Sequence, residues 1–292
     1  MTPLDLALMA ALFCALSGVP ALVSRMPLFT GRRIACGFIA LGTLAGLAAA
    51  ARMLLGEGPP ETVEMAWRLP IATLAFRLDP LSAFFLIPVL IVAGCTALYG
   101  CGYCATSPDN RGESLLTFYL GMAVAAIILL LVSANGVTLL FFWEAMALLV
   151  FMAMCLEHAR PEVREAGLHY LVASHVVTLA LMVLFALLSP DGGLRFPAPG
   201  SLAPTGIGAL AILVTALAGF GLKAGIMPLH VWLPTAHANA PSHVSALMSG
   251  IVIKMGIYGL LRTISFFSTP PLWWGILFLC LGIVSAVAGV LF

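Results

Sequence analysis

The sequence GFGLKAGIMPLHVWLPTAHANAPSHVSALMSGIVIKMGIYGLLR, residues 219–262, carries the strongest structural signal in this chain. Two apolar segments, which carry Lys223 and Lys254, flank a shorter mixed stretch. Pro228 has no backbone N–H to donate to Ala224, and three nearby glycines loosen the same turn, so we expect the first helix to break there. A broken membrane helix is tolerated only where its freed backbone groups meet protein or water. The break therefore predicts a polar cavity at membrane depth.

The composition indicates a polytopic membrane protein. Hydrophobic residues make up 62% of the chain and charged residues only 9%, roughly a third of the charge of a soluble domain. The net charge of +1 and the lack of a basic run give no reason to expect nucleic acid. Cys101 and Cys104 form one CxxC pattern, which without a second pair favours plain packing. With no GxGxxG, P-loop or cluster-ligand cysteine set, we expect no cofactor on this chain.

Apolar stretches of about 20 residues, the length a helix needs to cross the bilayer, recur along the chain. Because they are continuous rather than alternating, they predict helices and not a barrel. We expect an all-α transmembrane bundle of about nine helices with a broken seventh helix. The expected spans are 4–23, 34–54, 81–99, 114–133, 137–156, 166–188, 205–226, 242–262 and 272–292.

The ends of these spans suggest an orientation. We interpret 4–23 as a retained helix, since its flank contains Asp5 and no arginine or lysine. Arginines are almost balanced between the two sets of alternate loops, and Arg262 is counted among the loop residues. Only the arginine-dense first loop favours an N-terminus on the outside.

Formal charges near the middle of expected spans are Glu144, Lys223 and Lys254. Each costs about 2.5–3.5 kcal/mol at a helix centre, so each must be paired, hydrated or neutralised. Lysines also reach the interface along their long stems, an alternative that suits Lys223 near Pro228 better than Lys254. The shorter Glu144 side chain cannot reach far. These three residues are the first candidates for a functional site.

Histidines provide further titratable candidates. His169 and His175 lie on the sixth expected span, about 120° apart around the helix, so they do not share one narrow face. Histidine titrates near neutrality and can pass a proton, although a hydrogen-bonded packing role fits equally well. His230, His237 and His243 have no nearby carboxylate, so we expect no metal site. A proton-accessible mouth suits these three histidines better, although interfacial histidines without a role are at least as common.

FFWEAMALL, residues 141–149, followed by residues 219–262, resembles the signature of the antiporter-like, proton-translocating membrane subunits. That family includes subunits of NADH:quinone oxidoreductase, membrane-bound hydrogenases and Mrp-type antiporters. The stretch LHVWLPTAHANAPSHVSALMSG is most similar to the hydrogenase 4 component B branch. The resemblance covers residues 78–292.

The resemblance implies roles for individual residues. Glu144 matches the family's glutamate on the fifth helix, and Lys223 matches its partner lysine on the broken seventh helix. Lys254 matches a lysine or histidine that relays protons along a hydrated axis. Where respiratory members commonly carry a lysine on the sixth helix, this chain has His169 and His175.

The resemblance also implies a division of the chain. Family members have two inverted five-helix repeats, of which we expect the first, helices 4–8, to be present and the second to be missing. Either the chain is an N-terminal fragment or the other half comes from elsewhere. Residues 1–113 are expected to hold helices 1–3 with an extramembrane hairpin near 56–79. Residues 114–265 form the five-helix repeat, and residues 266–292 start a truncated second one.

The function implied is translocation of protons, or of Na⁺, through a hydrated relay of Glu144, Lys223 and Lys254. Redox chemistry in partner subunits would drive it, so the chain is an ion-translocating subunit of an oxidoreductase complex without a redox centre of its own. Its partners are other membrane and peripheral subunits and lipid, in the inner membrane of a prokaryote. Two alternatives stay open: a stand-alone secondary cation/proton antiporter, and a structural scaffold without transport.

Overall fold

The fold is an all-α bundle, as expected. The structure, a computed structural model, describes residues 1–292 except 24–27, 57–60, 68–72, 104–109, 190–193 and 292. Within these residues, eight helical segments are long and apolar enough to cross a membrane. They are Gly31–Leu54, Pro80–Gly100, Gly112–Leu131, Gly136–Glu157, Pro161–Leu188, Gly206–Ala224, Ser242–Ser265 and Leu272–Leu291.

The first expected span, 4–23, is not one continuous helix. It divides into α1 (Pro3–Leu16) and α2 (Val19–Val23). The break falls at Ser17 and Gly18, where the Ser17 hydroxyl donates to the carbonyl of Cys14 across 2.7 Å. A Cβ atom on Gly18 would lie 2.2 Å from the Cα atom of Phe118, so this glycine lets α5 (Asn110–Leu131) approach closely. With 14 residues, α1 is shorter than the about 20 that a spanning helix needs.

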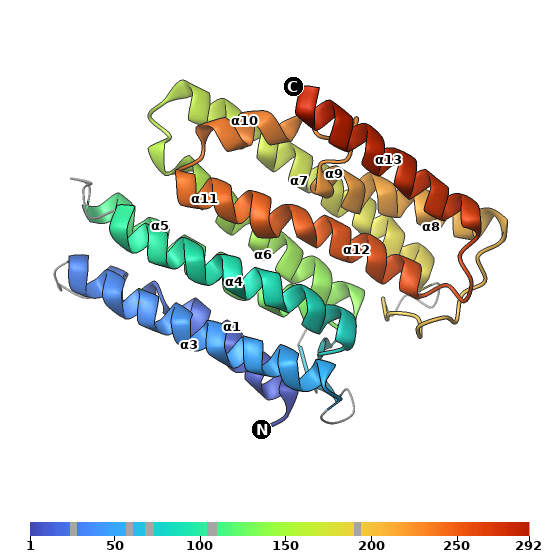
Figure 1. The fold of residues 1–292 in the computed structure, drawn as a ribbon, viewed down its shortest axis with the longest axis horizontal. Helices are drawn as coiled ribbons and strands as arrows, with labels where there is room; N and C mark the ends of the chain where they lie inside the picture. Colours follow the sequence, from blue (N-terminus) through green and yellow to red (C-terminus); the bar gives the residue numbers. More distant parts are fainter. Residues whose placement is uncertain (24–27, 57–60, 68–72, 104–109, 190–193, 292) are drawn as a thin grey trace.

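The N-terminal helices pack against one another and against the rest of the bundle. Figure 1 shows α1 and α3 beside each other, with α4 and α5 next to them, and residue contacts join α1 to α3 and α5, and α3 to α4. These helices begin and end as follows: α3, Leu28–Leu54; α4, Pro80–Tyr103; α5, Asn110–Leu131.

A two-stranded hairpin lies between α3 and α4. Strands β1 (Thr62–Met65) and β2 (Leu74–Arg77) pair antiparallel, in the region where a hairpin was expected. The N–H of Arg77 donates to the carbonyl of Val132 across 2.7 Å, and the N–H of Ala134 donates to the carbonyl of Ala75 across 2.8 Å. These bonds attach β2 to the turn between α5 and α6, so the hairpin marks that end of the bundle.

The five-helix part of the chain continues from α5. A short 3₁₀ turn, η2 (Cys155–Glu157), connects α6 to α7. The large rings of Trp143, Tyr170 and Phe220 are almost fully buried here, and the rings of Trp143 and Phe220 meet edge to face at 5.4 Å. These buried rings hold α6 against the seventh span. The helices are α6, Gly136–Met154, and α7, Pro161–Leu188.

The seventh span is interrupted, which confirms the expected break. Its helical part consists of α8 (Gly206–Ala216), a π-helical segment η3 (Leu217–Gly221) and α9 (Leu222–Ala224). It ends at Gly225, whose φ of 69° is in the left-handed region that glycine adopts without strain.

The helix ends three residues before Pro228 because a hydrogen-bonded glycine cap forms there. The N–H of Gly225 donates to Leu222 and the N–H of Ile226 donates to Gly221, both across 3.1 Å. This pair of bonds is the Schellman arrangement that stops helices at a left-handed glycine. The chain then turns and forms the short helix α10 (Trp232–Asn239).

The eighth span packs its backbone directly on the seventh. It consists of α11 (Ser242–Leu247), η4 (Met248–Val252, π-helical) and α12 (Ile253–Ser265). A Cβ atom on Gly256 would lie 2.4 Å from the Phe220 oxygen and 2.6 Å from the Ala224 nitrogen. Only glycine allows this approach, which brings α12 against η3 and α9.

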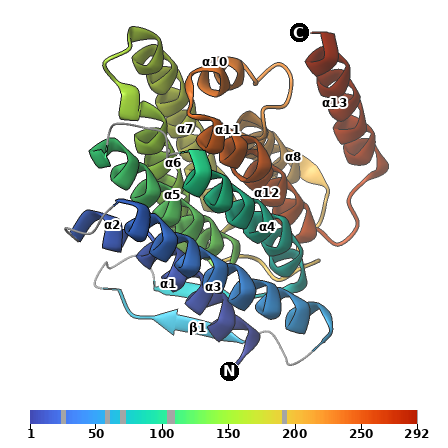
Figure 2. The ribbon, with the colours of Figure 1, turned by 60° about the vertical axis from the view of Figure 1, so that its left-hand side comes forward.

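The last helix, α13 (Leu272–Leu291), lies at the edge of the bundle, as Figure 2 shows. Only 6% of its most apolar 18-residue stretch is buried. It is attached near its start by the buried ring of Trp274, which meets Phe267 edge to face at 4.9 Å. A second attachment involves Ser285 and is described with the site.

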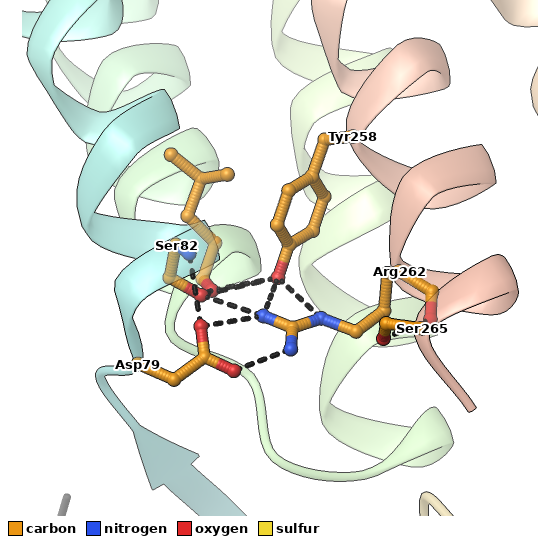
Figure 3. A network of polar contacts seen from close by, with 6 residues as sticks. Asp79, Ser82, Tyr258, Arg262 and Ser265 are labelled. Atoms are coloured by element: carbon orange, nitrogen blue, oxygen red, sulfur yellow. Dashed lines mark hydrogen bonds and ion pairs between the residues drawn. The ribbon is translucent and has the colours of Figure 1, made fainter. Parts of the chain in front are cut away.

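Arg262 is buried, so the expectation that it lies in an aqueous loop is wrong. Its guanidinium binds both carboxylate oxygens of Asp79 at the start of α4, and it also donates to Ser82 across 2.9 Å and to Tyr258 across 3.0 Å (Figure 3). Tyr258 in turn donates to the carbonyl of Leu131 across 2.9 Å. Because an arginine fork satisfies a carboxylate with two bonds, the pair fastens α12 to α4 and α5.

Candidate functional site

Lys223 is enclosed in the bundle. It lies on α9 with 1% of its surface exposed. Its Nζ atom donates to the hydroxyl of Tyr170 across 3.1 Å and to the hydroxyl of Ser174 across 3.0 Å, both on α7. The same nitrogen lies 4.4 Å from the ring centre of Tyr170 and 5.5 Å from that of Trp232. Aromatic faces attract a cation, so these two rings can accommodate an ammonium.

Glu144 contacts the same helix, α7, one turn further along. It lies on α6 and is partly buried. The Thr178 hydroxyl donates a hydrogen bond to its carboxylate, and that hydroxyl also lies 3.1 Å from the carbonyl oxygen of Ser174. A hydroxyl donor is a good partner for a carboxylate at membrane depth, because hydrogen bonds to charged groups are stronger than neutral ones.

Helix α7 links the two charged residues. Tyr170, Ser174 and Thr178 follow each other at intervals of four residues and therefore lie on one face of the helix. In the part of the chain that the structure describes, these hydroxyls, rather than a direct ion pair, connect Glu144 to Lys223. The two charges still interact electrostatically. The site is therefore an acid and an amine joined by a polar stripe.

Side chains form hydrogen bonds with backbone groups that the interruption of the seventh span leaves free. The indole N–H of Trp232 donates to the carbonyl of Leu222 across 2.9 Å. The backbone N–H of Met227 donates to the hydroxyl of Ser285 on α13 across 3.0 Å. Backbone groups freed inside a membrane protein need such partners, so these contacts hold the turn after Lys223 in place.

Lys254 lies apart from the other two charged candidates. It is exposed, two residues from Gly256. At 100° per residue, it occupies the face of α12 opposite to the one that Gly256 packs against α9. The structure therefore brings Glu144 and Lys223 together and places Lys254 outside their network.

The candidate histidines also lie outside this network. His169 and His175 are exposed on α7, and the Nδ1 atom of His175 lies 2.8 Å from the carbonyl oxygen of Leu171. His169 lines an apolar surface groove of about 490 Å³ together with Pro228 and Trp232. His230 is half-buried, and its Nδ1 atom has no hydrogen-bond partner within the described residues.

Two other features bear on metal binding and on the turn. Cys104 of the CxxC pattern lies outside the described residues, so the expectation of no metal stays a prediction. His237, between the seventh and eighth spans, has its Nδ1 atom 2.8 Å from the hydroxyl of Ser245, and burial lowers the pKa of this imidazole. The contact joins α10 to α11.

Three hydroxyl residues of the site were missed in the sequence. Tyr170, Ser174 and Thr178 are uncharged and common in membrane helices, so they do not stand out individually. Their four-residue spacing within 166–188 is the signal that points to them, because it places them on one helical face. The histidines drew attention instead, since they titrate.

The fold and the site define a class: a multi-pass helical membrane protein with a partly buried acid and a buried amine beside an interrupted helix. The chain belongs to the family described as NADH:quinone oxidoreductase/Mrp antiporter, transmembrane, whose sequence profile matches residues 133–292. That match contains the site described above.

Comparison with known proteins agrees with this membership. Over 249 residues, 84% of this chain and 38% of the relative, the sequence is 38% identical to an uncharacterized protein of Mycobacterium tuberculosis (strain H37Rv). Hydrogenase-4 component B of Escherichia coli (strain K12) is 35% identical over 76% of this chain and 33% of the relative. NADH-quinone oxidoreductase subunit N of Desulfovibrio desulfuricans is 30% identical over 73% of this chain and 45% of the relative. The chain spans less than half the length of these relatives.

The fold is also similar to a solved structure. A chain of the membrane-bound sulfane sulfur reductase, an archaeal respiratory membrane complex, superposes with a TM-score of 0.71 and 24% sequence identity. The superposition covers 88% of this chain and 40% of that chain. This likeness confirms the polytopic helical fold.

Proposed function

We propose that this chain is a membrane subunit that translocates protons, and that Glu144 and Lys223 form the first relay of the path. One observation carries the proposal: an acid on α6 and an amine on α9 share the hydroxyl face of α7 inside an apolar bundle. Ionisable residues at membrane depth are costly and mark ion or proton pathways. Membership of the antiporter family supports the same function.

The relay works through opposing effects on charge. A buried amine loses the hydration that stabilises its charge, while a nearby carboxylate stabilises the ammonium. The charge of Glu144 therefore bears on Lys223, with which it interacts electrostatically. A change of charge near Glu144 makes Lys223 release or take up a proton. Hydrogen bonds to Ser174 and Tyr170 hold the amine in place.

The driving reaction belongs to other subunits. Three relatives are named as subunits or components of a hydrogenase, a formate hydrogenlyase and an NADH-quinone oxidoreductase. We propose that redox chemistry in such partners, in the inner membrane of a prokaryote, changes the charge near Glu144. The step from Lys223 to Lys254 stays a prediction of the family resemblance, because the structure places Lys254 on the opposite face of α12.

The test uses the 292-residue chain in lipid vesicles under an imposed membrane potential, with a pH-sensitive dye inside. Glu144→Gln keeps the shape of the side chain and removes its charge, so we expect it to abolish proton flux without changing the amount of folded protein. Glu165→Gln, an exposed position on α7, is the matched control and should retain the flux.

Other outcomes identify the alternatives. Equal proton flux in the unaltered chain and in Glu144→Gln would show that the pair does not conduct and would support a scaffold. Flux that requires external Na⁺, and disappears when choline replaces it, would support a cation/proton antiporter. Substitution of Na⁺ is measured in the same vesicles.

A further inference from the structure

A second buried ionisable cluster lies away from Glu144 and Lys223. Arg32 of α3 and Glu113 of α5 form an ion pair in which Nη2 and Oε2 are 3.4 Å apart, and their side chains are 6% and 11% exposed. His243 of α11 is 2% exposed and interacts electrostatically with Glu113. Three helices that are distant in sequence thus each contribute one ionisable group.

A cavity adjoins this cluster. Its volume is about 40 Å³, and Arg32 and His243 line it together with Cys36 of α3, Thr96 of α4 and Thr117 of α5. An ordered water needs about 10–15 Å³ and two to four polar partners. The cavity therefore has both the room and the polar groups to hold water beside His243.

The cluster lies at one end of the bundle. Arg32, Glu113 and His243 all belong to the first two turns of their helices, and Figure 1 shows these helices starting at the same end, where α10 also lies. The Asp79–Arg262 pair lies at the opposite end, beside the hairpin. The bond between His237 and Ser245 joins α11 to α10, whose Trp232 contacts Lys223.

A static ion pair accounts for only part of this arrangement. Arg32 and Glu113 can fasten α3 to α5 without a histidine, and a buried ion pair adds little stability over apolar packing. A buried imidazole beside a carboxylate and a hydrated cavity has a different capacity, because histidine exchanges its proton near neutral pH. Among the described residues, the titratable side chains that line the cavity are Arg32 and Cys36 of α3 and His243 of α11, and Glu113 of α5 pairs with Arg32 beside it.

We propose that Arg32, Glu113 and His243 form a hydrated proton-uptake site that supplies the Glu144–Lys223 pair. A hydronium ion in the cavity gives its proton to the His243 imidazole and leaves as water. The Glu113 carboxylate stabilises the imidazolium that forms, and Arg32 keeps Glu113 ionised. His243 later returns the proton to water on the side of the Glu144–Lys223 pair. This inference rests on the proposed function and adds the place where protons enter.

The first experiment measures hydration directly and needs no transport. The unaltered chain, with ¹⁵N-labelled histidine, is placed in lipid vesicles, and magnetisation transfer from water to the imidazole nitrogens is recorded. The His243 signal is assigned by its loss in His243→Gln or, if that variant does not fold, in His243→Asn. We expect transfer from water to His243 as well as to the exposed His158. Transfer to His158 without transfer to His243 would overturn the inference.

The second experiment measures proton flux in the vesicles described above. His243→Gln and Glu113→Gln should each slow the flux by on the order of 10²-fold, the lower end of what a positioned proton-transfer group contributes. His158→Gln is the matched control and should leave the flux unchanged. Unchanged flux in both cluster variants would also overturn the inference.

The two proposals fail in different ways. If Glu144→Gln conducts normally, the proposed function is wrong, whatever the hydration of His243. If Glu144→Gln blocks the flux while His243→Gln and Glu113→Gln do not slow it, only the uptake site is wrong.

Discussion

Lys223 on α9 donates a hydrogen bond to Ser174 on α7 across 3.0 Å. This contact places the acceptor of a buried ammonium on the helix that also carries the Glu144 partner, Thr178. One helix thus sets the geometry of both charges, and the first prediction concerns its hydroxyl stripe.

Removing the Ser174 hydroxyl should impair the relay. Ser174→Ala leaves the ammonium of Lys223 with Tyr170 as its remaining hydroxyl partner. Since a hydrogen bond to a charged group contributes about 1.5–3 kcal/mol, we expect proton flux in vesicles to fall by roughly 10- to 100-fold. Ser174→Thr keeps the hydroxyl and should retain most of the flux. Flux in Ser174→Ala equal to that of the unaltered chain would argue against the stripe.

Gly256 should tolerate no side chain. In Gly256→Ala the new Cβ atom meets the Phe220 oxygen and the Ala224 nitrogen, and backbone atoms cannot rotate away. Overpacking of this kind costs about 1–3 kcal/mol, so the midpoint of thermal unfolding in detergent should fall. Gly275→Ala on α13, where no heavy atom lies within 4 Å of the added Cβ, is the control and should leave the midpoint unchanged.

Removing one partner of the Asp79–Arg262 pair should destabilise the fold strongly, whereas replacing both partners by apolar residues should destabilise it less. Asp79→Leu or Arg262→Met alone leaves an unpaired buried charge, and such losses cost about 3–5 kcal/mol. The double variant removes both charges and should be clearly more stable than either single one. Thermal unfolding of the four proteins measures the coupling, and additive losses would show that the two residues act independently.

The same pair predicts a dependence of stability on pH. Burial alone would raise the pKa of Asp79, but the hydrogen bonds and charge of Arg262, together with Ser82, lower it below its ordinary value. A carboxyl with a lowered native pKa stabilises the fold fully above its unfolded pKa of about 3.9 and loses that contribution as the pH falls through the native pKa.

The difference in unfolding midpoint between the unaltered chain and Asp79→Asn isolates this contribution. It should stay constant from neutral pH down to about pH 4 and shrink below that value. A difference that already shrinks between pH 7 and pH 5 would contradict the lowered pKa.

Ser285 should protect the turn after Lys223. Its hydroxyl accepts from the N–H of Met227, so Ser285→Ala should speed hydrogen exchange at that amide. A neutral hydrogen bond contributes about 0.5–1.5 kcal/mol, which corresponds to roughly 2- to 10-fold faster exchange. Ser249→Ala, whose exposed hydroxyl donates to Ser245 within its own helix, is the control. Equal exchange in both variants would mean that α13 does not support the turn.

The membrane spans and the break near Lys223 could be predicted because hydropathy, glycine and proline act locally. The break after α1 could not, since Gly18 lies against the backbone of α5 at Phe118, a partner distant in sequence. Arg262 was misplaced for the same reason. An arginine at the end of an apolar run is expected in water unless Asp79, 183 residues away, is known to meet it.

The sequence predicts what kind of site this is, but not which of the charged residues belong to it. Glu144 and Lys223 stand out because charge is rare in apolar spans. Lys254 stands out equally, yet its direction depends on which face of α12 packs, and Gly256 determines that face through a contact with another helix.

The meeting of Gly256 with Phe220 and Ala224 has an electrical consequence. Backbone atoms in direct contact leave no gap for a single file of water between α9 and α12 at this level. This contact between α9 and α12 therefore separates Lys223 from the outer face of α12. Under the proposed function, a proton that leaves Lys223 does not cross this contact, so a step to Lys254 would have to pass along α7 or around the turn at Gly225.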